Sequence, residues 1–243
     1  TWRFKAVYLT FLLYIVVDIL LAPSHLFEHI YMEAVLGYDS LNVISLNWML
    51  LLGTVVGSVF TFYTFSRRKW CYRTMTVIAF LAITGYLMMF YFTIDYGLSK
   101  EVLMLPLFLR SFGYVIIAIC FITALSRVPF QNFFEAVSVQ AFVSASFGRA
   151  LGAAVLERAL SVVMKKNTML LGSALDAVHP QASHIPLGQL SEILQQQALM
   201  VSMKELYGWL TLISLFCLML FWISHNSVRP LHALHPRYRV IRR

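Results

Sequence analysis

The sequence predicts an all-α, polytopic membrane protein, a six-helix transmembrane bundle with both termini in the cytoplasm. Of its 243 residues 60% are hydrophobic and 12% are charged, whereas a typical globular chain carries about 25% charged residues. The apolar residues gather in six long runs, and one soluble core of this chain length could not bury them. Runs such as residues 9–15 do not alternate between polar and apolar side chains, so they indicate helices and not strands of a membrane barrel.

Each predicted span is near or above the roughly 20 residues that cross a bilayer as a helix. The spans are 6–27, 41–65, 71–94, 102–125, 136–163 and 205–224. Short breaks at 31–40 and 94–101 face outward, and those at 66–71 and 126–135 face inward.

The longest break, 164–204, is predicted to be an external loop. Within it Leu187, Leu190, Leu194 and Val201 recur at helical spacing. This spacing indicates an amphipathic helix, which either lies at the membrane interface or packs as a short loop helix.

The distribution of basic residues sets the predicted orientation, because cytoplasmic segments are enriched in Lys and Arg. Five of the 19 basic residues lie in the predicted external segments and two, Arg110 and Arg149, lie within spans. The other twelve are cytoplasmic: Arg3, Lys5, Arg67, Arg68, Lys69, Arg73, Arg127, Arg229, Arg237, Arg239, Arg242 and Arg243.

The predicted organisation is a transmembrane unit over 1–229 followed by a basic cytoplasmic tail over 230–243. Membrane topology accounts for most of the net charge of +8, so the partner it indicates is the lipid bilayer and not nucleic acid. The expected location is the cell membrane, either the inner or the plasma membrane, which the chain crosses several times.

No metal site or cofactor is expected. The cysteines Cys71, Cys120 and Cys217 lack the spacing of a zinc site. His25, Glu28 and His29 spell H-x-x-E-H, a zinc-peptidase pattern. They lie at the outer end of a predicted span after Pro23, and no further constellation of Glu or His ligands is evident, so we interpret them as interfacial polar residues.

Ionisable residues inside spans carry the functional signal, because they tend to face a cavity or a partner. These are Asp18, Arg110 and Arg149. Counted at about 1.5 Å per residue their depths are similar, so either arginine could pair with Asp18.

The pair is either a structural ion pair or a proton- or cation-binding site in which an arginine tunes Asp18. With two arginines and one aspartate, one positive charge lacks a counter-charge. A further acidic partner, an anionic substrate or a water-filled cavity would each explain this excess.

Two glycine pairs indicate close helix packing. Gly148 and Gly152 flank Arg149 in the fifth span, and Gly53 and Gly57 lie at the same spacing in the second. Glycines at this spacing let a second helix approach closely, so both helices are predicted to make tight contacts.

Four stretches resemble the C-terminal six-helix half of the fourteen-helix drug:proton antiporters of the major facilitator superfamily, the multidrug efflux permeases. The likeness covers essentially the whole chain, although the aspartate common in the internal basic turn of facilitators does not precede Arg67. The four stretches are the basic turn 67–73, residues 109–114, residues 147–154 and residues 195–203.

The resemblance implies proton-coupled export of drug-like or amphipathic small molecules by a secondary transporter, not an enzyme. It places Asp18 in the central cavity as the proton-coupling candidate and Arg110 beside it, and it places the two glycine pairs and Arg149 near the interface with the other half. Further cavity or substrate candidates are Tyr14, Asn47, Trp48, Phe112, Tyr114 and Gln140.

Alternating access needs two halves. We therefore expect the chain to work with a missing N-terminal half or a second copy. The alternatives are an uptake facilitator for a polar or anionic solute, a membrane-embedded metalloenzyme that uses the H-x-x-E-H segment, and a membrane scaffold that does not transport.

Overall fold

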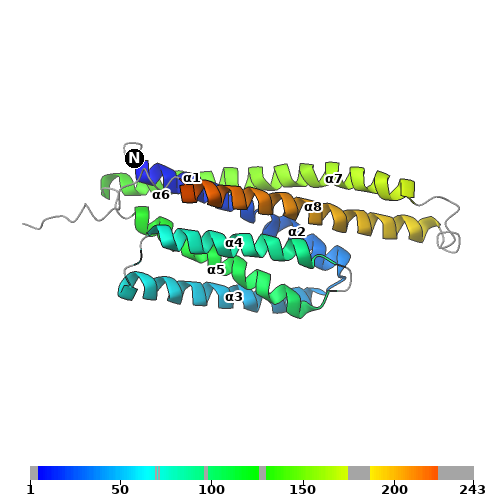
Figure 1. Ribbon diagram of the computed structural model, residues 1–243, viewed down its shortest axis with the longest axis horizontal. Coiled ribbons are helices and arrows are strands. Elements are labelled where there is room, and N and C mark those ends of the chain that lie inside the picture. The colour runs from blue at the N-terminus through cyan, green and yellow to red at the C-terminus, as the bar shows by residue number, and fades with distance from the viewer. Residues whose placement is uncertain are drawn as a thin grey trace, which may run out of the picture.

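The computed structural model describes residues 5–68, 70, 72–95, 98–125, 130–174 and 187–223. Every element within these ranges is a helix (Figure 1), which confirms the predicted all-helical class. The predicted basic tail, 230–243, and Lys69 in the basic turn lie outside the described residues.

The first helical stretch is longer than predicted. It consists of α1 (Lys5–Leu21), α2 (Pro23–Ile30) and the π-helical η1 (Tyr31–Val35). Pro23 starts α2 at a position where its missing N–H costs nothing. The helix passes the predicted end at residue 27 because Tyr31, Met32 and Val35 continue its buried face. Glu28 therefore lies within this helical stretch and not at its end.

Three helices form one layer of the bundle. They are α3 (Ser40–Tyr63), which the π-helical η2 (Thr64–Arg68) extends, α4 (Tyr72–Thr93) and α5 (Lys100–Leu125). Helix α5 lies between α3 and α4 and packs against both.

Gly53 and Gly57 allow α3 to approach α5 closely. A Cβ atom added at Gly53 would lie 2.6 Å from the carbonyl oxygen of Phe108, and one at Gly57 would lie 3.1 Å from that of Phe112. The tight contact predicted for the second span therefore exists. Its partner is α5 of the same bundle. The expected position near an interface with a second half stays a prediction.

The second layer contains the remaining helices (Figure 1). Helix α6 (Phe130–Val143), the π-helical η3 (Ser144–Leu151) and α7 (Gly152–Ala174) follow one another without a break, and the last helix is α8 (Leu187–Ile223). Helix α8 packs against both α4 and α7, and η3 packs against α1.

The predicted external loop 164–204 is mostly helical. Residues up to Ala174 continue α7, and the predicted amphipathic helix is the first part of the 37-residue α8. It is continuous with the last apolar span, so it is not a separate helix lying at the interface. The two helices extend because they pack together: Asn167 donates to the Ser202 hydroxyl (2.9 Å), and Ala198 is buried.

The α7–α8 hairpin projects beyond the layer of α3, α4 and α5 (Figure 1). Gly208 lies against the ring of Tyr91, which is two residues before the end of α4. Leu187 is 21 residues before Gly208 along α8, so α8 extends past that layer by roughly 30 Å at 1.5 Å per residue.

Five described helical stretches are long and apolar enough to cross a membrane. The prediction of a multi-pass membrane protein is thus supported. The stretch 130–174 is not among the five, because its apolar part, Phe133–Ser146, is short and Glu157, Arg158, Lys165 and Lys166 follow it. The five are Leu12–Val35, Leu41–Arg68, Tyr72–Thr93, Lys100–Leu125 and Gly188–Phe221.

Replacing Gly53 by alanine should destabilise the bundle by about 1–3 kcal/mol, because the new methyl group would force α3 away from α5. Unfolding of the purified protein in detergent measures the change. Gly172→Ala is the matched control, since nothing lies within 4 Å of its added Cβ. Equal stability of the two variants would contradict the close α3–α5 contact.

Candidate functional site

A buried ion pair joins three helices. Arg110 on α5 donates from Nη1 to Glu28 Oε2 on α2, and the hydroxyl of Tyr86 on α4 donates to Glu28 Oε1 over 2.6 Å. The Glu28 and Arg110 side chains are only 8% and 16% exposed. Each carboxylate oxygen thus accepts a hydrogen bond, as a buried charge requires.

Tyr207 on α8 adds an unsatisfied hydroxyl to this site. The residue is 1% exposed, and its Oη has no hydrogen-bond partner among the described residues. Its ring lies 6.4 Å from that of Tyr86, the residue whose hydroxyl binds Glu28. We call Glu28, Tyr86, Arg110 and Tyr207 the Glu28 cluster.

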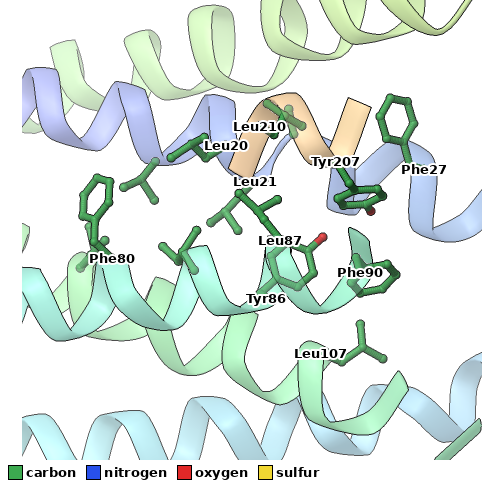
Figure 2. Packing of buried hydrophobic residues seen from close by; sticks show 14 of the residues in the cluster. Leu20, Leu21, Phe27, Phe80, Tyr86, Leu87, Phe90, Leu107, Tyr207 and Leu210 are labelled. Atoms are coloured by element: carbon green, nitrogen blue, oxygen red, sulfur yellow. The ribbon is translucent and has the colours of Figure 1, made fainter. Parts of the chain in front are cut away.

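Aromatic rings shield the Glu28 cluster. Phe90 stacks on Tyr207 with ring centroids 5.1 Å apart, and Phe27 meets it edge-on at 6.0 Å. Figure 2 shows the hydroxyls of Tyr86 and Tyr207 pointing toward one another between α4 and α8. Water has little access here, so changes in charge or hydrogen bonding carry a large free-energy cost.

The carboxylate partner of Arg110 differs from the one considered from the sequence. Arg110 pairs with Glu28 and not with Asp18. The reason is that the buried face of the first stretch continues past residue 27 to Val35, so Glu28 lies inside the bundle beside Arg110. Glu28 is thus a further acidic partner, one of the three explanations considered for the excess of arginines.

Asp18 lies in a second polar group about 15 Å along the α1–α2 stretch from Glu28, at 1.5 Å per residue. The hydroxyl of Ser144, the first residue of η3, donates to Asp18 Oδ2 over 2.5 Å. Tyr14, one turn from Asp18 on α1, meets Tyr114 on α5 with the two hydroxyls 3.4 Å apart. We call Tyr14, Asp18, Tyr114 and Ser144 the Asp18 cluster.

A π-helix contributes to the Asp18 cluster. Its wider turns disturb the regular hydrogen-bond ladder, and such segments frequently occur at functional sites. The side chains of Phe147 and Arg149, and any contact of Gly148, lie outside the described residues, so the possible Arg149–Asp18 pair stays a prediction. Gly152, which follows η3, is buried.

The other cavity candidates do not gather at these clusters. Phe112 faces α3, where its ring lies 5.6 Å from that of Phe60. Asn47 and Trp48 are exposed on α3. Gln140 is half-buried on α6, one turn before Ser144. Of the predicted set, the structure brings together Tyr14, Asp18 and Tyr114, with Arg110 one helical turn away along α5.

Two of the H-x-x-E-H residues, Glu28 and His29, contact different partners. Glu28 faces the bundle interior and binds Arg110, whereas exposed His29 lies 3.1 Å from Glu33 on the outer surface. Among the described residues no group of three or more His, Cys, Asp or Glu side chains could hold a metal ion. The side chain of His25 lies outside the described residues.

Sequence reasoning missed Tyr86, Ser144 and Tyr207 as site residues and gave Glu28 the wrong setting. For Glu28 a signal existed, because Tyr31, Met32 and Val35 continue the apolar spacing beyond Phe27. Tyr86 and Tyr207 are single tyrosines in apolar helices, and only the packing of α4 and α8 against α2 shows that their hydroxyls face a charge.

The chain matches no known protein-family model and no curated protein.

Removing either charge of the Glu28–Arg110 pair should destabilise the bundle by about 3–5 kcal/mol, because the other charge stays buried without a partner. Glu28→Gln, Arg110→Met and the double variant form a cycle that unfolding in detergent can measure. The double variant should lose less than the sum of the two single losses.

The control for this cycle is the exposed pair of Lys166 and Glu205, which lie 3.1 Å apart. Lys166→Met should change the free energy of unfolding by less than about 1 kcal/mol. Additive effects at Glu28 and Arg110 would show that the two side chains do not interact in the folded protein.

Proposed function

We propose that the chain is one half of a secondary active transporter that exports amphipathic small molecules in exchange for protons. The observation that carries this proposal is the presence of two separate carboxylates, Asp18 and Glu28, inside a helical stretch that can cross a membrane. An ionisable side chain at such depth is costly and tends to mark an ion or substrate pathway.

Asp18 is the proposed proton-coupling residue. It lies where three separate elements meet, namely α1, α5 and the π-helical η3, and its contact with Ser144 links α1 to η3. Protonation would remove the charge that Ser144 stabilises. It would thereby weaken the contact between α1 and η3, which is a direct route from proton binding to helix movement.

The pairing of Glu28 with Arg110 bears on the substrate. Because a carboxylate of the same bundle already neutralises Arg110, this arginine does not call for an anionic substrate. That favours uncharged, cationic or amphipathic compounds over the anionic solute of the uptake alternative.

The proposed topology has six crossings and both termini in the cytoplasm. The start of α1 and the end of α8 lie at the same end of the bundle (Figure 1), as an even number of crossings requires. The sixth crossing would use the stretch 130–174, in which α6, η3 and α7 pack against α1 and α8. A second half would complete the transport cavity.

Single cysteines in a cysteine-free variant test the topology. A cysteine at exposed Gln195 on α8 should react with a membrane-impermeant maleimide in intact cells. A cysteine at exposed Ser66 in η2 should react only in everted vesicles, because the basic turn is placed in the cytoplasm. Labelling of Ser66→Cys in intact cells would show that the orientation is the opposite of the proposed one.

Dye efflux tests the function. In everted vesicles from cells that express the native-length protein, a protonophore should abolish accumulation of a lipophilic dye. Asp18→Asn should reduce accumulation at least tenfold at equal expression, because the amide cannot release a proton. Glu101→Gln, an exposed change in the first turn of α5, is the matched control and should leave transport unchanged.

Unaltered proton-dependent transport by Asp18→Asn would assign coupling to another residue or to the other half. Solute uptake into cells that does not depend on the proton gradient would favour the uptake facilitator.

A further inference from the structure

The unpartnered hydroxyl of Tyr207 needs an explanation. A buried hydroxyl without a hydrogen bond costs free energy, and phenylalanine would fill the same space between Phe27 and Phe90 without that cost. The hydroxyl points toward that of Tyr86 (Figure 2), which donates to the carboxylate of the buried Glu28–Arg110 pair. This position indicates that the hydroxyl forms its hydrogen bond in a state of the Glu28 cluster other than the observed one.

The hydrogen bonds around Glu28 define that state. While Glu28 is ionised its oxygens only accept, and Arg110 and Tyr86 supply the donors. A protonated Glu28 carries an O–H group that needs an acceptor, which a guanidinium cannot provide. The Tyr86 hydroxyl already donates to Glu28 Oε1, whereas the lone pairs of the Tyr207 hydroxyl accept no hydrogen bond and offer such an acceptor.

We propose that Glu28 is a second proton-binding site, and that its protonated carboxyl group donates a hydrogen bond to the Tyr207 hydroxyl. A proton from water adds to one carboxylate oxygen, and the new O–H group donates to Tyr207 Oη. Arg110 keeps its proton, so the charge of the cluster rises from zero to one positive unit. The site deepens the proposed function, and its role in transport rests on that function.

The groups that face Glu28 determine when it can bind a proton. They are Tyr86 from α4 and Arg110 from α5, with Tyr207 of α8 next to Tyr86. The hydroxyl of Tyr31 on η1 donates instead to the carbonyl oxygen of Asp95 over 2.8 Å. Helix α7 also packs on α2 but exposes its charged residues, Glu157, Arg158, Lys165 and Lys166.

Arg110 is therefore the only cation in contact with Glu28 among the described residues, and it opposes protonation. Glu28 takes up a proton most readily when α5 moves Arg110 away from α2. Proton binding at this site is thus tied to the relative position of two helices.

Infrared difference spectroscopy of the purified protein tests the proposal without any transport assay. In the Asp18→Asn background, a change from mildly alkaline to mildly acidic pH should produce the carbonyl band of a protonated carboxyl group. The band should shift when the glutamates are labelled with carbon-13 and should disappear in Glu28→Gln. The isotope label identifies a glutamate even if Glu28→Gln does not fold.

Tyr207→Phe tests the hydrogen bond, because it removes only the hydroxyl. The band should remain and move to higher frequency, since the carboxyl O–H loses its acceptor. Tyr63→Phe, an exposed tyrosine on α3, is the matched control and should leave the band in place.

Absence of a glutamate band while the protein stays folded would overturn the proposal and make the pair a fixed structural contact. A band that Tyr207→Phe does not shift would overturn the part assigned to Tyr207. If Tyr207→Phe shifts the band in a protein that transports no dye, proton binding at Glu28 is supported and only the proposed export function is contradicted. The two hypotheses can therefore be rejected independently.

Discussion

An ionised side chain that leaves water must find its counter-charge inside the protein, and in this bundle that requirement brings four helices to one place. Glu28 on α2 holds Arg110 on α5 and accepts from Tyr86 on α4, while Tyr207 of α8 closes the site. Apolar contacts between lipid-facing helices specify position only weakly, because lipid tails are equally apolar. A buried charge pair admits few alternative registers, so it sets how α2, α4, α5 and α8 lie along their axes.

Helix α5 links this pair to the second polar group. Arg110 and Tyr114 are one turn apart, about 6 Å along the helix, and face α2 and α1 respectively. The opposite side of α5 packs tightly on α3 at Gly53 and Gly57. A movement of α5 would therefore carry both clusters and α3 together. The two carboxylates need not touch in order to influence one another.

The class of fold could be predicted from the sequence because long apolar runs have few physical solutions. The ends of helices were harder to predict. The predicted span ends at residue 27 and leaves Glu28 at the interface, whereas Tyr31 and Val35 continue the packed face and Glu28 is buried. The pairing of Arg110 depends on which helices lie next to α5. Tyr86 and Tyr207 can be recognised as site residues only once the positions of α4 and α8 are known. Packing partners of this kind have no local sequence pattern.

The length of α8 has a mechanical consequence. One uninterrupted helix carries Tyr207 inside the bundle and Leu187 at the far end of the projecting hairpin, 20 residues and roughly 30 Å away. Because α8 is one continuous helix, a tilt of about 5° near Tyr207 displaces its distant end by roughly 2–3 Å. The end of the hairpin therefore moves further than the packed part of α8 near Tyr207 whenever this helix tilts.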